Sequence, residues 1–257
     1  KLYLTDAAEA LKRASTDIFQ RLESLDMQLT DLQGSLQGQL TLAVESSAKY
    51  FVPHLFAAFK QQQPDIDLHL TVVNRAQVIK RLGDNRDDLV IMSLVPPDMA
   101  LEFLPFLNYP IVAVAPPGHA LGKASTLNLK DLEPYPLLVR EAGSGTRKAC
   151  EEYFQQKRVH FAQKHEIASL EAVREGVVAG LGLALLPRHS VTQELANGRL
   201  LELPVEELPL YRSWCVVHAR GKRLSPVAQA FLEYIRSERT QISALGQTFS
   251  GYCPTPH

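Results

Sequence analysis

The chain has 257 residues, of which 46% are hydrophobic and 21% charged. This composition is ordinary for a globular protein and allows one large domain or two small ones. The formal net charge of -1 excludes a broadly basic surface for nucleic acid, so we expect any DNA-reading part to lie outside this chain.

Cysteine usage and the absence of apolar spans indicate the compartment. Cys150, Cys215 and Cys253 are widely spaced and lack any CxxC pairing, which indicates reduced thiols. No apolar run is long enough to span a membrane, and the first residues contain no signal-peptide core. We therefore expect a cytoplasmic protein with no membrane contact. Because the chain lacks an initiator Met, we also expect it to be a fragment.

Apolar residues recur at regular spacings through the first three dozen residues. The spacing alternates between three and four residues, at Leu11, Ala14, Ile18, Leu22, Leu25, Leu29, Leu32 and Leu36. This spacing predicts a long helix with one narrow apolar stripe, typical of a two-helix seam. Thr5 or Asp6 can cap that helix. We predict that residues 1–38 pair with another copy of the chain, and packing across its own body is the alternative.

Strands and helices then alternate. Strands are expected at residues 39–44, 66–73 and 89–92, and helices at residues 50–63 and 76–83. This β-α-β-α-β order predicts a parallel sheet with right-handed crossovers. Two further strands are expected at residues 104–107 and 109–115, followed by a second α/β unit with elements at residues 136–139, 146–157, 169–179, 183–187, 188–196, 200–203 and 211–218.

These elements predict an α/β fold of two lobes behind the N-terminal helix. We assign residues 39–116 and 219–240 to lobe I, because the last helix, starting at Pro226, would return to cover it. Residues 117–218 form lobe II, and residues 241–257 form a flexible tail. A cleft between two lobes is a common place for a small ligand.

The strongest local signal is Gly143-Ser144-Gly145-Thr146-Arg147, which precedes a predicted helix. The glycines let the backbone approach a ligand, and the helix start supplies free N–H groups at the positive end of the dipole. Ser144 and Thr146 add hydroxyl donors, and Arg147 adds a fork for phosphate or carboxylate. The segment does not match the P-loop pattern, and a capped turn with a surface Arg is the alternative.

Further polar residues follow the first two strands. Ser46-Ser47-Ala48-Lys49 precedes a helix and suits an anion for the same reason, although serines there are usually N-caps. Asn74-Arg75 either faces the same cleft or forms a turn with a solvated Arg. Ligands in open α/β sheets collect at these carboxyl ends of strands. Glu171 fits hydrogen bonding to ligand hydroxyls, or simply complements a helix start.

The sequence contains no recognisable catalytic motif. The eight His residues show no HExxH or other metal-ligand spacing, and no GxSxG nucleophile elbow occurs. Cys150 follows the Gly-rich loop, and we interpret it as a buried small residue. We therefore expect that the protein is not an enzyme and that it has no metal site and no resident cofactor.

Motifs along the chain resemble those of LysR-type transcriptional regulators without their winged helix. Leu4-Thr5-Asp6-Ala7-Ala8-Glu9 is similar to the start of the family's linker helix, with Ala8 replacing the usual Gly. Three further segments resemble its effector domain: Gln39-Leu40-Thr41-Leu42-Ala43, Pro53-His54-Leu55 with Phe59 and Pro64-Asp65-Ile66, and Gly180-Leu181-Gly182-Leu183-Ala184-Leu185-Leu186-Pro187. The resemblance implies a periplasmic-binding-protein-like body with two lobes.

Within that family the chain looks closest to CbbR-type regulators of Calvin-cycle genes, including the RuBisCO operon. Ala48-Lys49-Tyr50-Phe51, Asn74-Arg75 and Pro105-Phe106-Leu107 carry this likeness. Those relatives respond to ribulose 1,5-bisphosphate, phosphoglycolate, phosphoenolpyruvate or NADPH. The resemblance implies a homodimer or homotetramer, built through the linker helix and lobe contacts, that binds DNA only through the missing winged helix.

Our leading hypothesis is the effector-sensing and oligomerisation part of a transcriptional regulator. The predicted effector-binding residues are Ser46, Ser47, Ala48, Lys49, Asn74, Arg75, Gly143, Ser144, Thr146, Arg147 and Glu171. A solute-binding protein of a transporter is the main alternative, because it shares the two-lobe body. The third is a phosphate-handling transferase, for which no paired acid, base or nucleophile is apparent.

Overall fold

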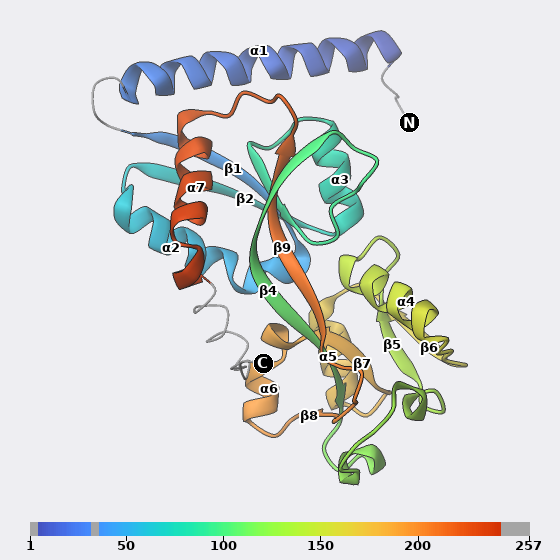
Figure 1. Cartoon of the computed structure of the whole chain (residues 1–257). Helices are drawn as coiled ribbons and strands as arrows, with labels where there is room; N and C mark the ends of the chain where they lie inside the picture. The colour runs from blue at the N-terminus through green and yellow to red at the C-terminus, as the bar shows by residue number, and fades with distance from the viewer. Residues whose placement is uncertain (1–4, 32–35, 243–257) are drawn as a thin grey trace.

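The computed structural model describes residues 5–31 and 36–242, in which a long helix lies across one end of a two-lobed body (Figure 1). That helix, α1 (Asp6–Asp31), is capped as predicted, since the Ala8 N–H donates to Thr5 Oγ1 at 3.2 Å. Its predicted stripe is exposed to solvent at Leu11, Ala14, Ile18, Leu22, Leu25 and Leu29. Leu32 lies outside the described residues, and Leu36 follows the helix and packs against the core.

The first lobe is built on a parallel sheet. Its elements are β1 (Gly38–Glu45), a 3-10 helix (Ser46–Tyr50), α2 (Val52–Gln62), β2 (Ile66–Val73), α3 (Arg75–Gly83) and β3 (Leu89–Met92). β1 pairs in parallel with β2 on one side and β3 on the other, which confirms the β-α-β-α-β prediction. The helix α7 (Pro226–Ser237) returns to this lobe, where the Phe231 ring lies 5.1 Å from the Phe59 ring of α2.

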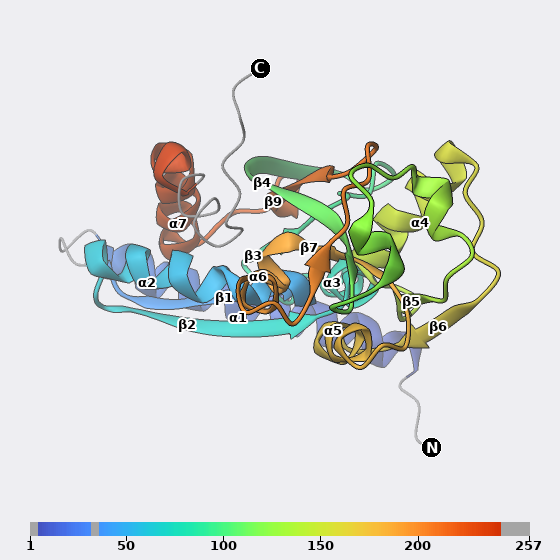
Figure 2. The same cartoon turned by 90° about the horizontal axis from the view of Figure 1, so that it is seen from below.

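Two long antiparallel strands, β4 (Leu101–Ala115) and β9 (Leu210–Ala219), run through both lobes (Figure 2). The prediction of two separate strands at residues 104–107 and 109–115 is wrong, because β4 is continuous. Pro105 and Pro110 lack an N–H and look like strand breaks, but a register shift between Pro105 and Leu107 accommodates the first of them.

The second lobe follows β4. Its elements are 3-10 helices (Ala120–Lys123, Leu129–Leu132), β5 (Leu137–Arg140), α4 (Gly145–Lys157), β6 (Lys164–Ile167), α5 (Leu170–Val178), β7 (Ala184–Pro187), a 3-10 helix (Arg188–Ser190), α6 (Thr192–Ala196) and β8 (Leu201–Glu202). β5 and β6 are parallel, and β7 pairs with β4.

Aromatic packing anchors the two long strands where the lobes meet. Trp214 of β9 is fully buried and stacks on Tyr109 of β4, with ring centroids 4.8 Å apart. Phe51, just before α2, packs against Trp214 at 5.5 Å. The core is therefore continuous from lobe I into the crossing strands.

The carboxyl ends of the parallel strands from both lobes meet at one place. β1 ends at Glu45 and β5 ends at Arg140, and these neighbourhoods are joined by a hydrogen bond from Arg140 to Ser46. Loops and helix starts rich in polar residues follow such strand ends, so this contact between the lobes is the place to look for a ligand site.

Candidate anion-binding site between the lobes

Arg140 connects the ends of β5 and β1. Its side chain is only 4% exposed, and its Nη2 donates to Ser46 Oγ at 3.2 Å. Nε and Nη2 also donate to the carboxylate of Glu141, at 2.8 and 3.1 Å. The buried Nη1 has no hydrogen-bond partner among the described residues. Since an unpaired buried donor is costly, this N–H marks a place for an acceptor such as a ligand anion.

The loop after β5 packs on the start of α3. Asn74 caps α3 by accepting from the Gln77 N–H at 3.1 Å, and its Nδ2 lies 3.5 Å from Glu141 Oε1. The Ala76 N–H donates to the Gly143 carbonyl at 3.1 Å. Gly143 has φ +89°, and an added Cβ would lie 3.0 Å from Ala76 Cβ. Glycine is therefore needed for this close approach.

A second connection joins the 3-10 helix of lobe I to α5. Lys49 Nζ forms an ion pair with Glu171 Oε1, and Tyr50 Oη donates to the same oxygen at 3.0 Å. The Ser169 hydroxyl donates to Glu171 Oε2 at 2.9 Å. Partial burial raises the pKa of Glu171, but Lys49 and the other donors outweigh it and bring the pKa down to about 2. Glu171 is therefore ionised and already bonded to lobe I.

His189 makes a third connection, to the backbone of the predicted loop. Its Nε2 lies 2.9 Å from the Ser47 carbonyl, so Nε2 carries the proton that is donated. The rings of Tyr50, Phe51 and Tyr109 surround the imidazole. This burial lowers the pKa of His189 to about 4 and keeps it neutral.

Arg75 and Arg147, two predicted ligand cations, are bonded to protein groups. The Arg75 guanidinium donates to the Leu94 carbonyl at 3.1 and 2.6 Å. Arg147 reaches Glu151 at 2.8 Å and Glu166 at 2.5 Å. Both arginines line an open groove of about 510 Å³ between α3 and the start of α4, together with Gly143 and Ser144. The groove is large enough for a small metabolite.

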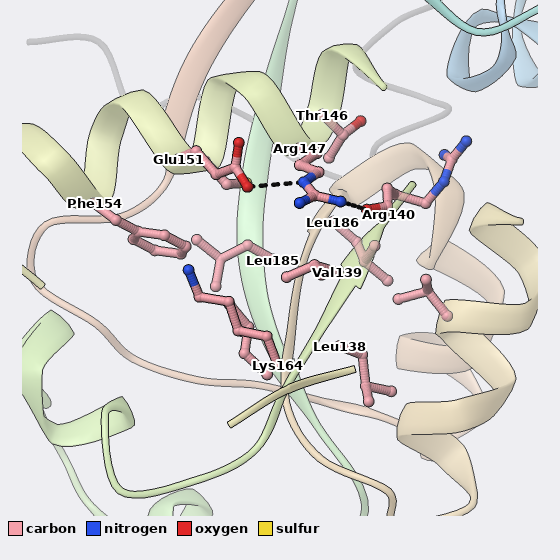
Figure 3. Close-up of a pocket in the computed structure, with 13 residues that line it drawn as sticks. Leu138, Val139, Arg140, Thr146, Arg147, Glu151, Phe154, Lys164, Leu185 and Leu186 are labelled. Carbon is pink, nitrogen blue, oxygen red and sulfur yellow. Dashed lines mark hydrogen bonds and ion pairs between the residues drawn. The ribbon is translucent and has the colours of Figure 1, made fainter. Parts of the chain in front are cut away.

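A separate pocket lies beneath α4, inside lobe II (Figure 3). Thr146 and Arg147 line it together with apolar residues such as Leu138, Leu185 and Phe154. Its cavity volume of about 20 Å³ holds a single water molecule and no metabolite. Thr146, a predicted effector contact, is 4% exposed and is one of the residues that line this pocket.

The structure thus brings most predicted residues to the contact between the lobes but not to one point. Ser46, the Ser47 carbonyl, Lys49, Asn74, Gly143 and Glu171 all bridge the lobes, whereas the Ala48 side chain is buried in the core. Sequence reasoning missed Arg140 and His189. The one available signal for Arg140 was a charged residue at the end of a buried apolar run.

Within residues 5–31 and 36–242, no three His, Cys, Asp or Glu side chains gather in a way that suits a metal ion. In the same part of the chain, no helix combines the length and the apolar character needed to cross a membrane. The polar contact between the lobes is therefore the feature on which an interpretation of function rests.

Comparison with known proteins places this chain in a family. Residues 33–240 match the LysR substrate binding domain. The chain belongs to this LysR family. The transcriptional activator CmpR of Synechocystis sp. strain PCC 6803 is 40% identical over 243 residues, covering 95% of this chain and 80% of CmpR. A RuBisCO operon transcriptional regulator of Acidithiobacillus ferrooxidans is 39% identical, covering 91% of this chain and 76% of that protein.

A solved structure of a regulatory domain matches the body of the chain. The CcmR regulatory domain of Synechocystis PCC 6803, in complex with 2-PG, superposes with a TM-score of 0.76 at 36% identity. The match covers 80% of this chain and all of that domain. These findings confirm the predicted family, its likeness to regulators of carbon-fixation genes and the periplasmic-binding-protein-like fold. The transporter alternative is not favoured, because these relatives are transcriptional regulators.

Proposed function

We propose that this chain senses a phosphorylated metabolite for a LysR-type regulator of carbon-fixation genes. The single observation that carries the ligand class is the buried, unpartnered Nη1 of Arg140 beside Ser46. A phosphate oxygen is the acceptor that this guanidinium fits best. The 2-PG in the related CcmR domain supports 2-phosphoglycolate as the first candidate. Ribulose 1,5-bisphosphate, phosphoenolpyruvate and NADPH are the others.

The ligand would act on the contacts between the lobes. Ser46, Asn74 and Lys49 already hold Arg140, Glu141 and Glu171 across that contact, and a ligand has to rearrange some of these bonds. It shifts the lobe arrangement only by the difference in its affinity for the two states. In this proposal the chain works in the cytoplasm as a homodimer or homotetramer paired through α1, and an N-terminal winged helix contacts DNA.

Isothermal titration calorimetry of the chain with 2-phosphoglycolate tests the ligand class. The three other candidates are titrated in parallel. We expect one site per chain for at least one phosphate ester, and about tenfold or greater weakening in Arg140→Ala, since a lost charged hydrogen bond costs about 1.5–3 kcal/mol. Arg199→Ala is the matched control, because Arg199 pairs with Glu175 on the outside of lobe II. If folded protein gives no binding heat with any of the four compounds, the proposal is wrong.

A further inference from the structure

Glu45 is a buried carboxyl group in the contact between the lobes that the proposed ligand site does not use. It is the last residue of β1, precedes Ser46 and is 2% exposed. Both of its oxygens accept hydrogen bonds from Ser93 at the end of β3. The Ser93 N–H donates to Oε1 at 3.1 Å, and the Ser93 hydroxyl donates to Oε2 at 3.2 Å. The carboxyl group is therefore held in one orientation.

That orientation directs Glu45 at the first residue of α4 in the other lobe. A Cβ added to Gly145 would lie 2.4 Å from Glu45 Oε2, closer than any side chain tolerates. Glycine at position 145 thus lets a carboxyl group lie against the start of α4. Free N–H groups and the positive end of the helix dipole favour an anion there. The free N–H groups and the helix dipole would also favour the anionic group of a ligand at this end of α4, which Glu45 occupies.

Charged and titratable groups face Glu45 from several elements. Arg75 of α3 and Arg140 of β5 attract its ionised form. Burial is the main cause of the raised pKa of Tyr109 in β4 and of Cys215 in β9, and the charge of ionised Glu45 raises both further. Burial is nevertheless the dominant influence, and it raises the pKa of Glu45 to about 8 despite Ser93 and the two arginines. The carboxyl group therefore carries a proton at neutral pH and a charge only in alkaline solution.

A doubly charged phosphate beside Glu45 would disfavour the ionised carboxylate further. Two acidic groups that lie close together in a buried site cannot both stay ionised, so one of them takes up a proton. Building on the proposed function, we infer that Glu45 is a specificity-determining residue that admits a phosphate dianion only when its own carboxyl group is protonated. Above pH 8, where free Glu45 is ionised, ligand binding and protonation of Glu45 are then one coupled event, with the proton drawn from solvent.

Calorimetric titration of the chain with 2-phosphoglycolate from pH 7.5 to 9.5 tests this coupling. The second pKa of a phosphate ester is about 6, so the ligand charge is constant over this range. We expect the affinity to fall by about tenfold per pH unit above pH 8, because each ionised Glu45 has to regain a proton. Glu45→Gln, which keeps the shape and loses the charge, should bind with nearly constant affinity over the range.

Ser93→Ala provides an independent readout. Its hydroxyl stabilises the ionised form of Glu45, so its loss should move the fall in affinity to higher pH. A wild-type affinity that is equal at pH 7.5 and 9.5, or a fall that persists in Glu45→Gln, overturns the inference and leaves the proposed function intact. Failure of folded wild-type protein to bind at pH 7.5 overturns the phosphate site itself and the inference with it.

Discussion

Lys49 of lobe I forms an ion pair with Glu171 of lobe II, and this pair closes one side of the contact between the lobes. The two side chains are 34% and 39% exposed, so water screens the attraction. We expect a coupling free energy of about 0.5–1 kcal/mol between them, at the upper end for exposed pairs, because Tyr50 and Ser169 hold the same carboxylate.

A double-mutant cycle of Lys49→Met and Glu171→Gln measures this coupling. Urea unfolding can be followed through Trp214, the single tryptophan of the chain, which lies buried between the lobes. The pair Lys148–Glu152 within α4 is the matched control, and its coupling should be about 0.3–0.5 kcal/mol, as for other i,i+4 pairs. A lobe pair no stronger than this control would show that Lys49 and Glu171 do not help to hold the lobes together.

Arg140 and Arg147 should differ in their effects on ligand affinity. Arg140 offers an unpaired buried N–H, whereas Arg147 is held by Glu151, Glu166 and the Arg140 carbonyl. We expect Arg140→Ala to weaken 2-phosphoglycolate binding by about 2 kcal/mol, and Arg147→Ala by less, with a loss of lobe II stability instead. Calorimetry and urea unfolding of both variants decide this. A larger affinity loss in Arg147→Ala would indicate that the anion binds in the groove beside α4 and not at Arg140.

His189 should make the protein sensitive to acid. The pKa of His189 is lowered by burial to about 4, below the ordinary 6.5, so between these values the unfolded chain binds the proton and the folded one does not. Stability should therefore fall by up to about 1.4 kcal/mol per pH unit as the pH drops from 6.5 towards 4. His189→Phe should flatten this dependence while costing about 1 kcal/mol at pH 7, because the Ser47 carbonyl loses its donor.

Urea unfolding at pH 7, 6 and 5 measures the His189 contribution. His69→Gln on the exposed face of β2 serves as the control, because that imidazole lies on the surface. An acid dependence that is the same in His189→Phe, His69→Gln and wild type would assign the sensitivity to other groups.

The apolar stripe of α1 should drive self-association. Leu22 is 57% exposed in the structure, and so is Leu181 in the loop before β7. Leu22→Lys should lower the association constant seen in sedimentation equilibrium by tenfold or more, because a charge would enter the seam between two helices. Leu181→Lys adds the same charge at equal exposure outside the stripe. If both variants associate as wild type does, the stripe is not the contact between copies.

The order of the lobe I elements could be predicted because each segment carries its own signal. Alternation in β1, the apolar run of β3 and the caps of α1 and α3 are local features of the sequence. β6 was not predicted, since Lys164–Ile167 is polar and largely exposed and so lacks an alternating pattern. The continuity of β4 also escaped prediction, because it depends on pairing with β9 across the bulge.

The site was harder to predict than the fold, for a physical reason. Arg140 and Ser46 are 94 residues apart in the chain, and only the meeting of the lobes buries the guanidinium. Glu45 looks like part of a polar turn until Ser93 and Gly145 enclose it. Hydroxyl groups and helix starts predict an anion site from local sequence, whereas the charged side chains around the proposed site come from distant segments.

Within residues 36–242, the chain passes between the lobes only through β4 and β9, whose backbones are hydrogen-bonded to each other along most of their length. A hinge made of free loops would let the lobes swing wide apart, whereas two paired, twisted strands restrain their relative movement. We expect a response to a ligand to change the relative orientation of the lobes through this ribbon. Because α7 contacts both α1 and β1, it links the sheet of lobe I directly to the long helix.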